Sequence, residues 1–100
     1  MKVILFLHIK EKYYNMIAEG KKTHEYRIVK GFWNKRLSKN FTHIAFLSGY
    51  PCNNKPYLLC KKEKIDVLRF KELPEYAREE FVDFETSLFF DISFIFIIPV

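Results

Sequence analysis

The sequence predicts a small α+β protein, a mixed β-barrel of about five strands with two helices. The first reason is the order of the expected elements: strand, helix, strand, loop, two strands, helix and strand, without the regular alternation of a parallel sheet. The second is composition, because 11 Phe in 100 residues suit a small barrel whose interior is filled by a few bulky side chains. This length leaves no room for a second core of ordinary size, so we expect one domain over residues 1–100.

The first third of the chain predicts a strand, a helix and a second strand. Residues 2–9 are rich in Val, Ile, Leu and Phe and do not alternate, which predicts a strand buried on both faces. Residues 10–19 have apolar side chains at helical spacing, and Gly20 stands where a left-handed residue ends a helix. Residues 23–29 then predict a strand whose odd-numbered side chains share one face.

The middle of the chain predicts a connection, a strand and a sharp turn. Residues 31–40 are a basic connection with room for one helical turn at residues 32–37. Residues 42–48 have the composition of a strand. Residues 49–56 contain Gly, two Pro and two Asn, which is the strongest turn signal in the chain.

The last part of the chain predicts a long strand, a helix and a closing strand. Residues 57–70 indicate one long or bent strand, with a charged centre at residues 61–64 that is either a bend or a solvent-facing rim. Pro74 suits the first turn of a helix that reaches about residue 83. The apolar residues 92–99 predict a buried strand, because this run falls short of the ~20 residues of a membrane-spanning helix.

The net charge of +5 is unevenly distributed. Residues 1–40 carry ten Lys or Arg against three acids, whereas residues 71–100 carry two against seven. A single-stranded nucleic-acid surface needs cations that hold phosphates beside rings that stack bases. A solvated face of ordinary lysines is the alternative explanation. The basic residues of the first part are interleaved with Tyr13, Tyr14, Tyr26, Phe32 and Trp33.

Other features argue against several classes of protein. The N-terminal residues have one charge and a short apolar run without a small-residue cleavage site, so we expect a cytoplasmic protein with no membrane segment. Cys52 and Cys60 then predict reduced thiols rather than a disulfide. His8, His24 and His43 do not have the paired spacing of a zinc site, and we assign no metal and no cofactor. The oligomeric state is left open.

One octapeptide carries a specific signal. Residues 20–27 read Gly-Lys-Lys-Thr-His-Glu-Tyr-Arg, which has the form G-x-K-x-x-E-x-R, and they lie between an expected helix and an expected strand. This motif resembles the hallmark of the ASCH family. The similarity extends more loosely upstream, through the helix that ends at Gly20, and downstream to the strand before Pro74.

The resemblance implies a PUA-like barrel with a cleft beside the motif, and a role in binding RNA during translation or RNA processing. Some ASCH relatives resemble hydrolases of RNA or of acetylated cytidine. In these relatives a Lys at the position of Lys22 is catalytic, a Thr nucleophile stands at the position of Glu25, and a Glu of the second helix falls near Glu80. Because a carboxylate does not replace a hydroxyl in attack on an amide, Glu25 argues against deacetylation.

Three side chains of the motif are candidates for the site. Lys22 follows a helix end, and its ammonium can reach into a cleft toward a phosphate or a base oxygen. Glu25 and Arg27 share one strand face, where their pairing would hold the guanidinium at a fixed angle for a phosphate or a base edge. The alternative is a purely structural ion pair.

Three further residues are expected beside this site, where a nucleic acid would enter, and a fourth belongs to it only if the protein is a hydrolase. Trp33, the single Trp of the chain, is flanked by Lys35 and Arg36 and is a candidate for stacking on a base. A Trp that packs in the core is the alternative. Glu80 is expected on the acidic outer face of the second helix, and it serves as an acid or base only if the protein is a hydrolase.

Three functions are consistent with these features. The first is an RNA- or nucleotide-binding domain with Lys22, Glu25 and Arg27 at its site. The second is an RNA-directed hydrolase, a ribonuclease or an acetylcytidine amidohydrolase, that uses Lys22 with Glu25 or Glu80 as acid and base. The third is a protein-interaction module whose basic half meets an acidic partner. The sequence favours the first function and leaves open whether the protein is an enzyme.

Overall fold

The structure of the chain, a computed structural model, describes residues 2–49 and 57–99. In these ranges five β-strands and three α-helices confirm the α+β class, although the sequence predicted two helices. Two short 3-10 turns, Phe70–Glu72 and Val82–Phe84, flank α3. In chain order the elements are β1 (Ile4–Ile9), α1 (Glu11–Ala18), β2 (His24–Ile28), α2 (Gly31–Leu37), β3 (His43–Ser48), β4 (Tyr57–Arg69), α3 (Glu75–Glu80) and β5 (Leu88–Pro99).

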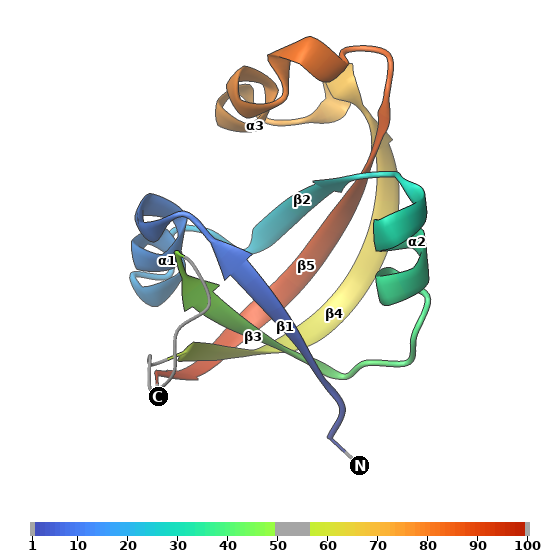
Figure 1. Cartoon of the computed structure of the whole chain (residues 1–100). Coiled ribbons are helices and arrows are strands. Elements are labelled where there is room, and N and C mark those ends of the chain that lie inside the picture. Colours follow the sequence, from blue (N-terminus) through green and yellow to red (C-terminus); the bar gives the residue numbers. More distant parts are fainter. Residues whose placement is uncertain (1, 50–56, 100) are drawn as a thin grey trace.

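The five strands form one mixed sheet in the order β1-β3-β4-β5-β2 (Figure 1). β1 runs parallel to β3, and the other neighbouring strands are antiparallel. β1 and β2 are therefore the edges of the sheet. In the described residues these two strands do not pair with each other, so the sheet is open between them. The mixed five-stranded sheet is confirmed, whereas its closure into a barrel is not.

β4 and β5 are long, curved strands that run the length of the sheet (Figure 1). The register between them shifts at Leu59/Cys60 and again at Lys62/Lys64. A bulge bends and twists a strand. The second shift lies in the charged centre of β4, where the sequence predicted a bend or a solvent-facing rim. The prediction of one long or bent strand over residues 57–70 is confirmed for Tyr57–Arg69.

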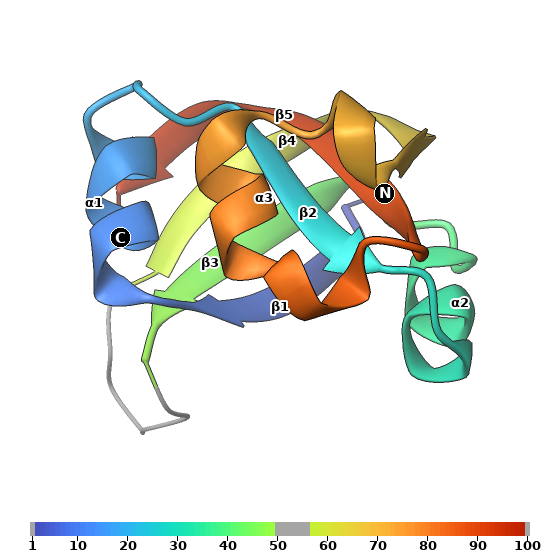
Figure 2. The same cartoon turned by 90° about the horizontal axis from the view of Figure 1, so that it is seen from above.

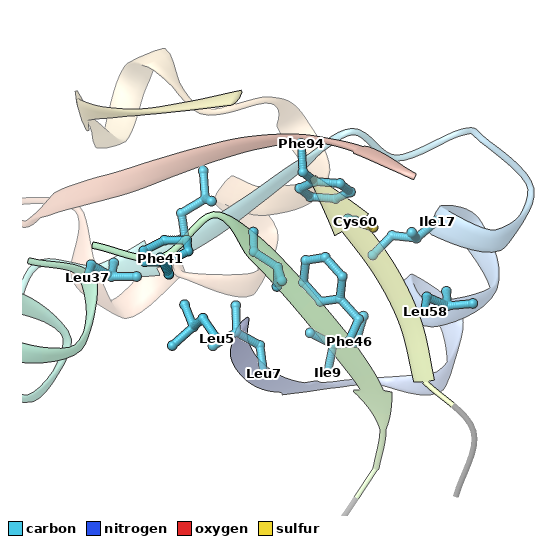
Figure 3. Packing of buried hydrophobic residues seen from close by; sticks show 12 residues of the cluster. Leu5, Leu7, Ile9, Ile17, Leu37, Phe41, Phe46, Leu58, Cys60 and Phe94 are labelled. Atoms are coloured by element: carbon cyan, nitrogen blue, oxygen red, sulfur yellow. The ribbon is translucent and has the colours of Figure 1, made fainter. Parts of the chain in front are cut away.

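The main hydrophobic core lies on the face of the sheet that α1 and α2 cover from opposite sides (Figure 1). At its centre the ring centroids of Phe46 and Phe94 are 4.8 Å apart, which is typical of packed aromatic pairs. Burial raises the pKa of the Cys60 thiol to about 12. Cys60 is a free thiol, as predicted, while Cys52 lies outside the described residues. Figure 3 labels ten side chains of this core: Leu5, Leu7, Ile9, Ile17, Leu37, Phe41, Phe46, Leu58, Cys60 and Phe94.

β1 and β5 each bury only one of their two faces, whereas the sequence predicted more complete burial. The odd-numbered side chains of β1 point into the main core, whereas Phe6 is 48% exposed. Alternate side chains of a strand point to opposite faces, and the helices cover only one face of β1. The strand predicted over residues 2–9 is present as Ile4–Ile9, but its predicted burial on both faces is wrong. The closing strand, predicted as buried over residues 92–99, differs in the same way: Phe94 is buried and Ile95 is half exposed.

A smaller core lies on the opposite face of the sheet, next to α3. Its buried residues are Leu73, Ala77 and Phe89. The next residue of β5, Phe90, packs against the main core, so the two cores occupy opposite faces of this strand. Figure 2 shows α3 crossing over β2. Pro74, predicted in the first turn of this helix, is the residue directly before it.

The third helix, α2, replaces the connection predicted over residues 31–40. Leu37 is buried, and Trp33, four residues earlier, packs against the main core. This i, i+4 pair gives a short segment one apolar stripe. Only two apolar positions mark that stripe among charged neighbours, and for this reason the sequence indicated no more than a single turn.

Two remaining predictions concern a turn and the membrane. The turn predicted over residues 49–56 begins at Gly49, whose φ of 73° favours glycine, and residues 50–56 lie outside the described ranges. No helix within residues 2–49 and 57–99 is long and apolar enough to cross a membrane.

Phe46→Ala is expected to destabilise the protein by about 3–5 kcal/mol, because the fully buried ring would leave a cavity beside Phe94. Phe32→Ala is the matched control, since Phe32 is 63% exposed. The free energies of unfolding in urea measure both effects. Equal losses in the two variants would contradict the position of the core.

Candidate functional site

A cavity of about 280 Å³ lies at the open seam between β1 and β2. This volume is near the lower limit of about 300 Å³ for small-molecule sites. Five of the seven candidate residues, Lys22, Glu25, Arg27, Trp33 and Glu80, line this one cavity. The complete lining comes from β1, α1, β2, α2, α3 and the residues beside them: His8, Ile9, Lys10, Tyr13, Lys22, Glu25, Tyr26, Arg27, Ile28, Trp33, Tyr76, Ala77, Glu80 and Phe81.

Lys22, Glu25 and Arg27 form a chain of ion pairs, which we call the buried triad. Lys22 Nζ is 3.3 Å from Glu25 Oε1, and Arg27 Nη2 is 2.8 Å from Glu25 Oε2. The side chains of Lys22 and Glu25 are only 2% and 9% exposed. The predicted strand and the predicted convergence of these three side chains are therefore confirmed.

The local backbone explains this convergence. The chain leaves α1 through Gly20, whose φ of 76° lies in the left-handed region. The amide of Lys22 then donates to Met16 O at 3.2 Å, and this turn places Lys22 directly before β2. Glu25 and Arg27 follow on one face of β2, because they are two residues apart in a strand.

Three tyrosine rings surround the ammonium of Lys22. Their centroids lie 5.0 Å from Nζ for Tyr13 of α1, 5.5 Å for Tyr26 of β2 and 5.1 Å for Tyr76 of α3. Lys22 also donates a hydrogen bond of 3.3 Å to the Tyr76 hydroxyl. The quadrupoles of such rings stabilise a desolvated cation, which offsets part of the cost of burying Lys22. The protein itself therefore holds this ammonium on several sides.

Tyr13 and Tyr26 remain neutral phenols. Burial raises the pKa of Tyr13, and its hydrogen bond to Glu80 raises it further. Burial likewise raises the pKa of Tyr26, and the nearby negative charge of Asp91 adds to the shift. Neither hydroxyl ionises at neutral pH, so the charge of the cavity comes from its Lys, Arg and Glu side chains.

Arg27 bridges the two edges of the open seam. Its Nη2 donates to the backbone oxygen of His8 in β1 at 3.2 Å, and its guanidinium carbon lies 4.7 Å from the ring centroid of Trp33. Its Nε is buried and has no hydrogen-bond partner in the described part of the chain. An unpaired buried donor costs free energy.

Trp33 lies on a helix and not in a loop as the sequence suggested. Its packing in the core is observed, whereas its stacking on a base stays a prediction. It packs against the main core and lines the cavity. Arg36 and Lys35 belong to the same helix but do not line the cavity. Arg36 lies 5.1 Å from the ring centroid of Trp33 and donates to Phe6 O at 2.7 Å, so this guanidinium is engaged with β1. Lys35 is exposed.

Glu80 is exposed, as expected for the outer face of its helix, and it also lines the cavity. Lys10 Nζ donates to both of its carboxylate oxygens at 2.7 Å, and the Tyr13 hydroxyl donates to one of them at 2.8 Å. The hydrogen bond from Lys10 lowers the pKa of Glu80, and the bond from Tyr13 lowers it further. Glu80 is therefore an ionised carboxylate that ties the start of α1 to α3, and it is not a proton donor at neutral pH.

Sequence reasoning did not assign His8, Lys10 or Tyr76 to the site. His8 and Lys10 lie at the end of β1 and belong to no motif. Tyr76 is 54 residues from Lys22, whose ammonium it contacts. A short helix after Pro74 was predicted, but no local pattern indicates that its first turn contacts Tyr13 and Lys22.

Comparison with known proteins adds no further residues to this site. No protein-family model, curated protein or solved structure matches the chain. Among residues 2–49 and 57–99, no group of three or more His, Cys, Asp or Glu side chains could hold a metal ion. The resemblance to the ASCH family therefore rests on the motif and stays a prediction, and inferences on function depend on the geometry of the cavity.

Glu25→Gln is expected to destabilise the protein more than Lys22→Met. Without Lys22, Glu25 still pairs with Arg27, whereas neutralising Glu25 leaves two cations of the cavity without their shared partner. Breaking a buried ion pair typically costs about 3–5 kcal/mol, and we expect Glu25→Gln in this range and Lys22→Met below it. Free energies of unfolding at neutral pH test the order. The reverse order would contradict the shared carboxylate.

The contacts of Glu80 make stability depend on pH. Its pKa is below the ordinary value of 4.5 in the folded protein, so these contacts stabilise the fold above that pH and their contribution is lost as the pH falls. Glu80→Gln should lower the free energy of unfolding at neutral pH. The difference from the wild type should shrink as the pH falls below the ordinary value of 4.5. Urea titrations across this range measure it, and a difference independent of pH would refute the ion pair.

Proposed function

We propose that this protein is an RNA- or nucleotide-binding domain whose site is the cavity at the seam. The observation that carries the proposal is the buried triad, in which two cations share one carboxylate inside an aromatic cavity. In the whole lining, the three cations Lys10, Lys22 and Arg27 face the two carboxylates Glu25 and Glu80. With histidine neutral the walls carry a net charge of +1, which favours a ligand with negative charge.

The aromatic walls favour a flat ring as part of the ligand. Tyr13, Tyr26, Trp33, Tyr76 and Phe81 all line the cavity. Stacking of a base on an aromatic side chain is typically worth about 1–3 kcal/mol, and proteins that recognise unpaired RNA use such rings. A volume of about 280 Å³ suits one base better than several.

Lys22 and Arg27 have different roles in this proposal. Lys22 is held by Glu25 and by the hydroxyl of Tyr76, so it supplies a fixed positive charge. Arg27 lines the cavity beside the ring of Trp33, and its side chain is 19% exposed, more than that of Lys22. A guanidinium next to a stacking surface can donate to a base edge or a phosphate while the ring holds the base. Arg27 is therefore the principal polar contact that we propose.

The resemblance to the ASCH family supports the same site. The family is expected to have a PUA-like barrel with a cleft beside the motif, and the cavity lies beside Lys22, Glu25 and Arg27. We propose that the open sheet corresponds to such a barrel. In the open sheet, the hydrogen bond from the Arg27 side chain to His8 O connects β1 and β2, which have no backbone pairing.

A hydrolase of RNA or of acetylated cytidine is the second candidate, because Lys22, Glu25 and Glu80 line the same cavity. The charges favour binding over this chemistry. The Nζ of Lys22 is engaged by Glu25 at 3.3 Å and by the Tyr76 hydroxyl at 3.3 Å, so it is not free to act on a substrate. The lowered pKa of Glu80 makes its carboxylate a weak base and leaves it no proton to donate.

Trp33→Leu is expected to weaken the binding of single-stranded RNA by about 1–3 kcal/mol, because it removes a stacking surface of the cavity. Phe32→Leu is the matched control, since this neighbouring ring does not line the cavity. Fluorescence anisotropy of a labelled RNA measures the affinity. The affinity should also fall as salt rises, because phosphate contacts release counterions.

Two results would favour another function. RNA affinity that is insensitive to salt and to Trp33→Leu would point to the protein-interaction module. Incubation of the pure protein with RNA and with acetylcytidine is expected to give no product. Multiple turnovers of either substrate that vanish in Lys22→Ala would place the hydrolase first.

A further inference from the structure

A second hollow, of about 370 Å³, adjoins the cavity. Lys10, Tyr13, Tyr76 and Glu80 line both spaces, so these four side chains form a shared wall between them. The second hollow, which we call the outer groove, extends from this wall between α1 and α3. A ligand longer than one base can therefore continue from the cavity across the wall.

The shared wall does not oppose an anionic chain. Both oxygens of Glu80 accept hydrogen bonds from Lys10 at 2.7 Å, and Tyr13 donates to one of them at 2.8 Å. The ammonium of Lys10 thus balances the negative charge of Glu80. A phosphate that crosses the wall meets a neutral ion pair and two aromatic rings, and no uncompensated carboxylate.

The charge of the cavity indicates which kind of phosphate it suits. Its lining has three cations and two carboxylates, which leaves one positive charge. A phosphate inside a nucleic-acid chain carries one negative charge, whereas a terminal phosphate carries about −1.5 to −2 at neutral pH. One internal phosphate therefore balances the cavity, and the terminal phosphate of a mononucleotide exceeds its charge.

We infer that the ligand is a single-stranded RNA chain rather than a free mononucleotide, with one nucleotide in the cavity and its neighbour in the outer groove. This inference rests on the proposed function. Lys12 lines the outer groove but not the cavity. Its Nζ lies 4.9 Å from the ring centroid of Tyr13, which places a cation beside a ring for a second nucleotide. Glu79 also lines only this groove, and its carboxylate weakens the binding of a phosphate there.

Two substitutions with opposite expected effects test the outer groove. Lys12→Ala should lower the affinity for a mixed-sequence RNA of about ten nucleotides by roughly tenfold, and Glu79→Gln should raise it severalfold. Neither should change the affinity for the four ribonucleoside 5′-monophosphates, measured by competition with the labelled RNA. Lys21→Ala and Glu19→Gln are the matched controls, because these exposed residues change the charge equally and line neither space.

The outcomes separate this inference from the proposed function. RNA that binds at least tenfold more tightly than any mononucleotide, with opposite shifts in the two groove variants and small shifts in the controls, supports the outer groove. Mononucleotides that bind as tightly as RNA, or groove variants that behave like their controls, overturn the inference and leave the binding domain in place. Absence of binding to every probe overturns both.

Discussion

The carboxylate of Glu25, held between two cations, is the interaction on which the site depends. Lys22 reaches it from the turn before β2, and Arg27 reaches it from within the strand. A buried carboxylate without partners would be strongly destabilising, so the position of Glu25 depends on its cationic partners. Three tyrosine rings then complete the surroundings of Lys22. Through the bond of Arg27 to His8 O, the same cluster connects α1, β2 and β1.

The open seam between β1 and β2 gives the cavity its space. Alternate residues of an edge strand direct their backbone polar groups away from the sheet, and two such carbonyl oxygens of β1 accept hydrogen bonds from arginines. Arg36 donates to Phe6 O at 2.7 Å and Arg27 to His8 O at 3.2 Å. These side chains satisfy part of an edge that would otherwise be free to pair with another strand. A backbone ladder in their place would fill the region that Trp33 now lines.

Fixed protonation states distinguish this cavity from a site of proton transfer. General acid–base catalysis needs groups whose pKa lies near the working pH. Here the phenols of Tyr13 and Tyr26 stay neutral and Glu80 stays ionised, while Lys22 is held in an ion pair with Glu25. Such a constant arrangement of charges and donors suits the recognition of an anion, because none of these groups must change its state when the ligand arrives.

The sequence by itself determined the features that depend on neighbouring residues. The left-handed end of α1 at Gly20 and the shared face of Glu25 and Arg27 follow from local backbone geometry. The succession of five strands along the chain, though not their order in the sheet, follows from composition and turns. The tertiary structure alone decided that β1 buries one face, that α2 is a helix, and that Tyr76 contacts Lys22 from 54 residues away. The physical reason is that burial and long-range contact depend on which segments lie across from each other, and no period within one segment contains that information.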